Sequence, residues 1–228
     1  ATHLYVIEGS ATMWYDVNEV DYNKVSSASF KDVNTVEVVA FQPFKNNTEF
    51  KVKLENSELE IKDVKLSNDM KTATLTLKEP FDLTQLGKTC KVEAIDYGTR
   101  DISFENLYES EEFVNQYTTD ETLGAIYTNE KTTFRVWAPT ATEVKLNLYT
   151  QGNEVEAYET VTMTKQTKGV WSYEALGDLD GKYYTYDVTV AGVTNKEVVD
   201  PYAQSTGING KRGMVLNMSA LTPDGWDN

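Results

Sequence analysis

Two runs of alternating apolar and polar residues follow each other in the second half of the chain. In the first run Phe134 and Val136 share one face, Trp137 falls on the opposite face, and Pro139 can donate no further hydrogen bond to a sheet. The second run, residues 144–149, repeats the alternation after a short polar link. Period-two alternation predicts two strands that each bury one face, and the short link predicts that they pair as antiparallel neighbours.

The first half of the chain has the same character. Apolar runs recur there at short, regular spacing, with turn-forming residues between them: 36–41, 50–54, 59–66, 73–77 and 90–95. Many short strands separated by turns are typical of a β-sandwich, which we expect over residues 1–106. A later aromatic run gives a similar expectation: Tyr184 and Tyr186 share one face with apolar neighbours and should be buried, whereas Tyr183 faces the other way.

Length and composition agree with this all-β picture. A chain of 228 residues is most simply divided into two domains, because domains cluster near 100 to 150 residues. We therefore predict two tandem β-sandwich domains. Asp and Glu number 36 against 21 Lys and Arg, which argues against nucleic acid as a partner, and no apolar run approaches the roughly 20 residues of a membrane span.

Residues that could carry metal or thiol chemistry are few. Cys90 alternates with Val92 and Ala94, so we interpret it as a small buried hydrophobe, and the single histidine, His3, has no second His or Cys to complete a metal site. No cofactor is expected. A structural calcium ion is left open, since acidic residues lie in loop-like surroundings without the spacing of an EF-hand: Asp120, Glu121, Asp178 and Asp180.

Separated runs in the second half resemble a known family. They are residues 123–127, 134–141, 144–149, 169–172, 181–186, 199–202, 209–215 and 222–226. In this order they resemble carbohydrate-binding module family 48, the β-sandwich that precedes the barrel in type I pullulanases of glycoside hydrolase family 13. The resemblance implies a family-48 module over 122–220, a linker over 107–121, an immunoglobulin-like domain before it, and a lead-in at 221–228 to a (β/α)8 catalytic barrel that lies outside this chain.

The resemblance also implies a function. The chain would be the non-catalytic N-terminal portion of a pullulanase, an enzyme that hydrolyses α-1,6 linkages, and would support the catalytic barrel. By itself we expect no catalysis, because a retaining glycosidase takes two carboxylates from a barrel of roughly 250 residues. Two alternatives stay open: a stand-alone pair of α-glucan-binding modules, and a structural spacer at the cell surface. The chain opens at Ala1 without a signal-peptide pattern, which suggests a mid-protein start, and we expect the parent protein outside a bacterial cell or on its surface.

Sugar binding can be judged against the family pattern. Binding members present two tryptophans, a lysine and an asparagine on one face, so that pyranose rings stack on the indoles. Trp137 matches the first tryptophan, but Asp187 stands at the lysine position and residues 192–196 offer no second tryptophan. Trp137 and Tyr183 are the candidate contacts to pullulan, starch or glycogen. The alternative for Trp137 is that the adjoining barrel covers it.

The glycine-rich segment near the C-terminus is the candidate interdomain surface. The residues predicted to contact the barrel are Asp200, Pro201, Tyr202, Asn209, Lys211, Arg212 and Trp226. Arg212 suits an interdomain anchor because its planar guanidinium can bind a carboxylate with two hydrogen bonds or stack on a ring. The alternative for Lys211 and Arg212 is a solvated basic turn.

Overall fold

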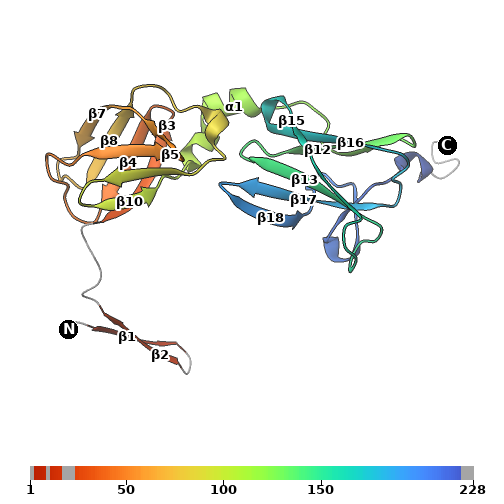
Figure 1. Ribbon diagram of the computed structural model, residues 1–228, viewed down its shortest axis with the longest axis horizontal. Coiled ribbons are helices and arrows are strands. Elements are labelled where there is room, and N and C mark those ends of the chain that lie inside the picture. Colours follow the sequence, from red (N-terminus) through yellow and green to blue (C-terminus); the bar gives the residue numbers. More distant parts are fainter. Residues whose placement is uncertain (1–2, 9–10, 17–23, 222–228) are drawn as a thin grey trace, which may run out of the picture. The chain divides into compact units, whose positions relative to one another are not determined.

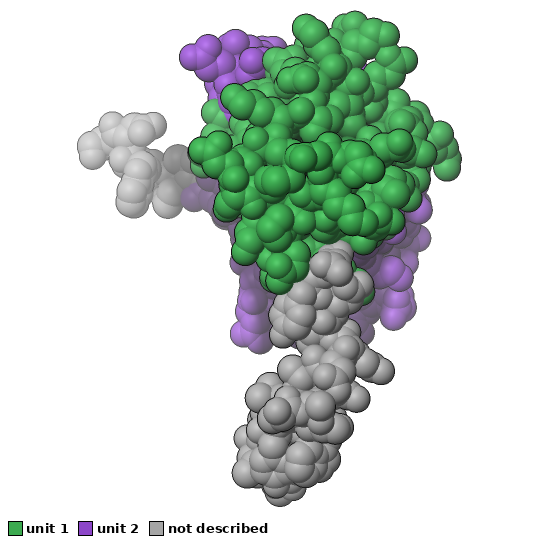
Figure 2. Space-filling view, turned by 90° about the vertical axis from the view of Figure 1, so that its left-hand side faces the viewer, with its two compact units in different colours: residues 1–81, 90–109 green, residues 82–89, 110–228 purple. Residues whose placement is uncertain are grey.

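The structure, a computed structural model, describes residues 3–8, 11–16 and 24–221. It divides into two compact units, coloured separately in Figure 2: unit 1 comprises 1–81 and 90–109, and unit 2 comprises 82–89 and 110–228. Both units are built from antiparallel sheets, which confirms the predicted all-β fold with two β-sandwiches. In the part of the chain that the structure describes, no helix is both long and apolar enough to cross a membrane.

Unit 1 contains two four-stranded sheets (Figure 1). The first has the order β3 (Val25–Asp32), β4 (Thr35–Ala40), β8 (Thr72–Leu77) and β7 (Ile61–Leu66); the second has the order β10 (Gly98–Asp101), β9 (Cys90–Ala94), β5 (Phe50–Leu54) and β6 (Ser57–Leu59). Two further strands, β1 (His3–Glu8) and β2 (Ala11–Asp16), pair with each other, and the 3₁₀ helix η3 (Glu105–Glu109) follows β10. Alternate residues of β4, β5, β8 and β9 are buried, as the sequence pattern predicted, and Cys90 is among them.

Unit 2 also contains two sheets, which Figure 1 shows as separate layers. The first has the order β11 (Gly124–Tyr127), β12 (Lys131–Trp137), β16 (Val170–Leu176) and β15 (Thr164–Lys165). The second has the order β14 (Glu159–Thr162), β13 (Glu143–Tyr149), β17 (Tyr183–Val190), β20 (Gly213–Met214) and β19 (Ser205–Thr206), and β18 (Val193–Val198) also pairs with β17. The helices are η2 (Leu83–Gln85), α1 (Glu111–Tyr117), η4 (Thr167–Gly169), η5 (Ile208–Gly210) and η6 (Met218–Ala220).

The predicted pairing of the two runs around Pro139 is wrong. β12 pairs with β11 and β16, whereas β13 pairs with β14 and β17, so the two strands belong to opposite sheets. The link between them is an arch: the Ala138 N–H donates to the Gly169 carbonyl in one sheet, and the Thr142 N–H donates to the Thr189 carbonyl in the other. Alternation correctly gives the buried face of each strand, but the arch turns those faces toward each other across the core instead of placing them side by side.

The chain passes between the two units three times, at 81/82, 89/90 and 109/110. Segment 82–89 is held inside unit 2, because the Tyr117 hydroxyl donates to the Leu83 carbonyl at 2.9 Å and the Ala191 N–H donates to the Gly87 carbonyl at 2.8 Å. Most of the segment predicted as a linker, 107–121, is helical. Helix α1 begins after Ser110, whose hydroxyl accepts from the Phe113 N–H as an N-cap.

Candidate functional site

The inner faces of unit 2 provide the rigid support for its surface sites. Tyr184 and Tyr186 are fully buried in the core, as predicted, and Trp171 is buried beside them. Tyr173 packs against the same cluster and is partly buried. The Trp171 indole N–H donates to the Ala138 carbonyl at 3.0 Å, which fastens the arch between the sheets. The side chains on the outer faces of β12 and β13–β17 are therefore presented from a well-packed sandwich.

Trp137 lies at the end of β12 on the outer face and is 38% exposed. Its indole N–H lies 2.9 Å from the Tyr117 carbonyl and 3.1 Å from the Lys168 carbonyl, so the donor is used inside the unit. The ring also meets Phe113 of α1 edge to face, with centroids 6.4 Å apart. Trp137 therefore fastens the end of α1 to this sheet, and part of its ring remains open to solvent.

Tyr183 lies in the other sheet, on β17, opposite Tyr149 of β13. A Cβ added at Gly152 or at Gly207 would lie 3.0 or 3.1 Å from the Tyr183 ring, so the ring packs against the backbone of two loops. Trp137 is in the β11–β12–β16–β15 sheet, whereas Tyr183 and Asp187 are in β17 of the opposite sheet. The structure therefore does not bring Trp137 together with Tyr183 or Asp187 on one sugar-binding face.

A groove runs along the outer face of the β13–β17 pair. Its lining residues are Asn147, Tyr149, Glu156, Ala157, Thr160, Asp187, Lys196 and Glu197. The register places Asn147 opposite Thr160 on one side and Thr185 on the other, so their side chains share this face. The Asn147 amide donates to Asp187 Oδ1 at 2.9 Å, and the Thr160 hydroxyl donates to Asn147 Oδ1 at 2.8 Å. The floor of the groove is thus a fixed set of amide, hydroxyl and carboxylate groups.

Tyr158 adds an exposed aromatic ring next to this groove. Its N–H donates to the Leu148 carbonyl, one residue out of the register that pairs Leu148 with Glu159, and Tyr158 directly follows Ala157, which lines the groove. The ring is 49% exposed. Partial burial, together with the nearby Glu159 carboxylate, raises the pKa of the Tyr158 hydroxyl. Our sequence analysis missed Tyr158, because it lies at a bend before β14, where strand periodicity gives no signal.

Arg212 is not placed as predicted. Its side chain is buried within unit 2, with 6% exposure, and its guanidinium carbon lies 3.5 Å from the centroid of the Tyr149 ring. The two terminal nitrogens donate to backbone carbonyls, Nη1 to Gln151 at 3.0 Å and Nη2 to Val155 at 2.8 Å. Nη2 also lies 3.6 Å from a Glu197 carboxylate oxygen. Because these groups occupy the guanidinium, Arg212 acts within its own sandwich and not as an interdomain anchor.

Asp200 is likewise buried, although we predicted it at an interdomain surface. Its Oδ2 accepts hydrogen bonds from the Tyr184 hydroxyl at 2.8 Å and the Tyr186 hydroxyl at 3.3 Å, and its Oδ1 accepts from the Tyr202 N–H at 2.8 Å. Burial raises the pKa of the Asp200 carboxyl, although the three hydrogen bonds oppose that shift. The carboxylate therefore ties the Asp200–Tyr202 turn to the core.

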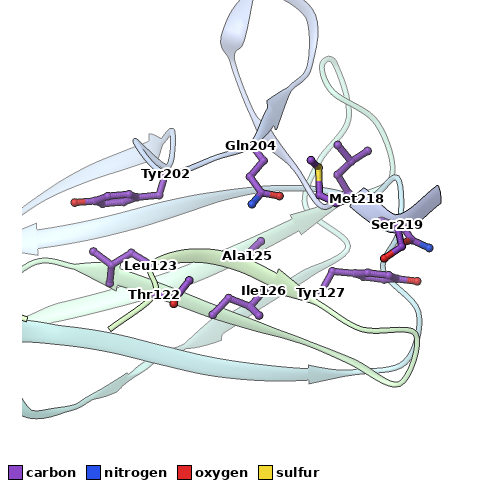
Figure 3. Close-up of a pocket in the computed structure, with 11 residues that line it drawn as sticks. Thr122, Leu123, Ala125, Ile126, Tyr127, Tyr202, Gln204, Met218 and Ser219 are labelled. Atoms are coloured by element: carbon purple, nitrogen blue, oxygen red, sulfur yellow. The ribbon is translucent and has the colours of Figure 1, made fainter. Parts of the chain in front are cut away.

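Tyr202 borders a crevice between β11 and the C-terminal segments (Figure 3). The crevice is lined by Thr122, Leu123, Ala125, Ile126, Tyr127, Tyr202, Gln204, Leu216, Asn217, Met218 and Ser219. Tyr202 is 49% exposed, and Met218 and Leu221 are also exposed. Of the other residues predicted for interdomain contact, Pro201, Asn209 and Lys211 are exposed, while Trp226 lies outside the described residues.

The acidic loop residues and the cysteine lie in different surroundings. Over the described ranges, no three His, Cys, Asp or Glu residues are grouped so that they could hold a metal ion. Asp178, one of the acidic residues left open for calcium, accepts hydrogen bonds from the Tyr127 hydroxyl and the Asp180 N–H. Burial raises the pKa of the Cys90 thiol to about 12, so this cysteine is a core side chain.

Comparison with known proteins agrees with this fold. Residues 122–203 match the family model for carbohydrate-binding module 48 (isoamylase N-terminal domain). A pullulanase of Klebsiella aerogenes is 42% identical over 111 residues, which cover 46% of this chain and 10% of that protein. A pullulanase of Bacillus subtilis is 32% identical over 130 residues, which cover 57% of this chain and 18% of that protein. The chain therefore spans a minor part of the length of these relatives.

Solved structures give the same result over more of the chain. The pullulanase of Anoxybacillus sp. LM18-11 complexed with maltotriose matches with a TM-score of 0.65 and 27% identity, over 86% of this chain and 28% of that one. The pullulanase of Bacillus acidopullulyticus matches in fold with a TM-score of 0.73 at 20% identity, over 90% of this chain and 38% of that one. The chain is therefore similar to the N-terminal, non-catalytic region of pullulanases, and its residues 122–203 match the carbohydrate-binding module 48 family.

Proposed function

We propose that this chain is the non-catalytic N-terminal portion of a pullulanase, a hydrolase of α-1,6 linkages, and that unit 2 contacts α-glucan chains in the groove on the β13–β17 face. The module match and the relatives crystallised with maltotriose and maltotetraose support this glucan role. The substrates of the parent enzyme would be pullulan, starch or glycogen. The bacterial relatives support a place outside a bacterial cell, which surface labelling of intact cells would test.

One observation carries the glucan proposal: Asn147, Thr160 and Asp187 form a hydrogen-bonded polar floor, and the exposed Tyr158 directly follows Ala157, which lines the same groove. A pyranose presents C–H groups that stack on an aromatic ring and hydroxyls that bond to amides and carboxylates. By analogy with aromatic–base stacking, one ring contributes about 1–3 kcal/mol, so we expect millimolar affinity. Tyr158 thus replaces Trp137 and Tyr183 as the first candidate for the stacking platform.

NMR titration of the isolated chain with maltoheptaose tests this site, because the method detects weak binding. We expect saturable shifts at the amides of Asn147, Tyr158 and Asp187, and a Tyr158→Ala variant should bind at least about fivefold more weakly. Trp137→Ala is the matched control, since it removes an exposed ring from the opposite sheet. Shifts centred on Trp137, or none at saturating sugar, would exclude the groove, and a cello-oligosaccharide tests selectivity for α-linked glucan.

A second role, support of the catalytic barrel, is favoured by the apolar side chains around the crevice. Tyr202 and Met218 are exposed there, and surfaces buried between domains are partly apolar. In a full-length pullulanase that contains this chain, Tyr202→Ala should lower the thermal stability of the enzyme while leaving the melting temperature of the isolated chain nearly unchanged. Val193→Ala, which truncates an exposed apolar residue on β18, is the control.

The two alternatives predict a different result. In these alternatives the chain acts as a stand-alone pair of glucan-binding modules or as a surface spacer. It then supports no catalytic barrel, so Tyr202→Ala should not affect the stability of any hydrolase. In either case we expect the isolated chain to release no reducing sugar from pullulan, because a retaining glycosidase needs two carboxylates about 5–5.5 Å apart across the bond. Sugar release that persists through further purification would contradict this expectation.

A further inference from the structure

Two loops meet over one end of the groove face. The first, 150–158, joins β13 to β14, and the second, 207–212, joins β19 to β20. A Cβ added at Gly152 would lie 3.0 Å from the Gly207 Cα, so the loop backbones are in direct contact. The Tyr183 ring lies against both glycines. The loops therefore leave no room for a side chain at either position.

The Arg212 guanidinium spans the contact between these loops. It belongs to the second loop, and its two terminal nitrogens donate to the Gln151 and Val155 carbonyls of the first loop. Its flat face rests on the Tyr149 ring at 3.5 Å from the centroid, which is within the range of a cation–π contact. One buried cation thus holds both ends of a five-residue stretch that leads directly into Glu156 and Ala157, two residues of the groove wall.

The same cation reaches the opposite wall through Glu197 of β18. The Glu197 carboxylate lies 3.6 Å from Arg212 Nη2 and accepts a hydrogen bond from the Tyr149 hydroxyl at 3.0 Å. The Glu197 N–H in turn donates to Asp187 Oδ1 on the groove floor at 2.9 Å. Glu197 adopts a left-handed φ of +50°, where the β17–β18 register is irregular, so these contacts hold an unfavourable backbone conformation in place.

We infer that Arg212 is the positioning residue of the glucan groove: without touching sugar, it fixes the distance between the loop wall at Glu156 and the β18 wall at Glu197. This inference rests on the glucan role proposed above. Lysine cannot replace arginine here, because a single ammonium cannot donate to two carbonyls in one plane while stacking on a ring. The width of the groove should therefore depend on the guanidinium shape and not on positive charge alone.

The test compares Arg212→Lys with Lys211→Ala, which removes a positive charge from the adjacent exposed residue. In Arg212→Lys we expect hydrogen exchange of the Tyr158 and Gly207 amides, which donate to the Leu148 and Arg212 carbonyls at the loop ends, to accelerate by about tenfold or more, with exchange in β13 and β17 unchanged. The maltoheptaose dissociation constant from NMR titration should rise at least about threefold, as loss of a preorganised site predicts. Lys211→Ala should change neither quantity.

The hydrogen-exchange experiment and the NMR titration together separate failure of the inference from failure of the glucan proposal. If the unmodified chain does not bind maltoheptaose, the glucan role fails, and the exchange arm still decides whether Arg212 holds the loop. If the chain binds and Arg212→Lys loosens 151–157 without weakening affinity, the positioning role is overturned. Unchanged exchange of the Tyr158 and Gly207 amides also overturns it, as does uniform acceleration across β13 and β17, which would indicate a general loss of stability.

Discussion

At the scale of single residues, Arg212 and Asp200 are buried charged side chains of unit 2, and different partners satisfy them. Arg212 is satisfied by two carbonyls, an aromatic face and the nearby Glu197 carboxylate. Asp200 is satisfied by two tyrosine hydroxyls and one backbone N–H. Removing a carboxylate from water favours its neutral form, and here burial outweighs the hydrogen bonds, so the pKa of Asp200 is raised. The pKa values of Tyr184 and Tyr186 are raised by burial and by this carboxylate.

Asp200→Asn should reveal this shift as a pH dependence of stability. Since the pKa of Asp200 in the folded state lies above its ordinary value of 3.8, its carboxyl contributes most stability below that value and less as the pH rises through the folded pKa. Asparagine does not titrate. The free energy of unfolding of the unmodified chain minus that of Asp200→Asn should therefore decrease as the pH rises from below 3.8 through the raised pKa of the folded carboxyl. Urea unfolding at several pH values measures this difference.

Asp178→Asn is the control, because its difference in unfolding free energy should change with pH in the opposite direction. The pKa of Asp178 is lowered, chiefly by the hydrogen bond from the Asp180 N–H and then by that from the Tyr127 hydroxyl. Its contribution to stability should therefore be lost as the pH falls, so the corresponding difference should increase with pH. If the Asp200 difference also increased with pH, hydrogen bonding would outweigh burial at that site, contrary to our assignment.

At the scale of elements, the turn after Asp200 is packed directly on the first residue of β11. Gly124 has a φ of +97°, and a Cβ there would lie 3.0 Å from the Tyr202 carbonyl oxygen. Two restrictions thus act at once: the left-handed backbone disfavours any L side chain, and the Tyr202 backbone would have to shift by a few tenths of an ångström to admit a methyl group. This close approach, together with the Asp200 carboxylate, fixes Tyr202 at the edge of the crevice (Figure 3).

Gly124→Ala and Gly177→Ala separate these two restrictions. Gly177 has a similar φ of +94°, but a Cβ there would meet no atom within 4 Å. Each substitution should lose about 1–2 kcal/mol of unfolding free energy to the backbone conformation. Gly124→Ala should lose a further 1–3 kcal/mol, roughly, to overpacking against Tyr202. Equal losses in chemical denaturation would mean that the turn moves away from β11 at little cost.

Sequence alternation correctly predicted which face of each strand is buried, but it did not predict which strands pair with each other. It correctly placed Phe134 and Val136 inside and Trp137 outside, because the side-chain period of a strand is a local property. It could not show that β12 and β13 lie in different sheets, since that depends on how the arch over 138–142 is hydrogen-bonded. For the same reason the family pattern placed Trp137 and Asp187 on one face, whereas they lie in opposite sheets.

The loops were the least predictable part of the candidate site. Arg212 lies in a glycine-rich segment without periodicity, and two of its partners are backbone carbonyls of Gln151 and Val155, which no residue type reveals. From the residue pattern we therefore predicted that Arg212 is a surface anchor. Only the fold shows that its loop, 207–212, lies against the loop 150–158. Tyr158 was missed because it follows the irregular segment 150–157, where the alternation of β13 is interrupted.

At the scale of the whole molecule, segment 82–89 makes unit 2 discontinuous in sequence. The segment lies between β8 and β9 of unit 1, yet it groups with unit 2 and carries two buried side chains, Leu83 and Leu86. A Cβ at Gly87 would lie 2.3 Å from the Thr140 carbonyl oxygen, so the segment packs closely against the arch between β12 and β13. A domain boundary at residue 106, as predicted from the sequence, would separate segment 82–89 from the rest of unit 2.

A fragment of residues 110–228 should therefore be less stable than the same unit in the full chain. It loses the hydrogen bonds to the Leu83 and Gly87 carbonyls, and burial of two leucines is worth on the order of 3 kcal/mol or more. Hydrogen exchange of the β13 and β17 amides measures the effect, with faster exchange expected in the fragment. A chain without residues 1–16 is the control, because β1 and β2 pair only with each other among the described strands. Equal protection of β13 and β17 in fragment and full chain would show that segment 82–89 contributes nothing to the stability of unit 2.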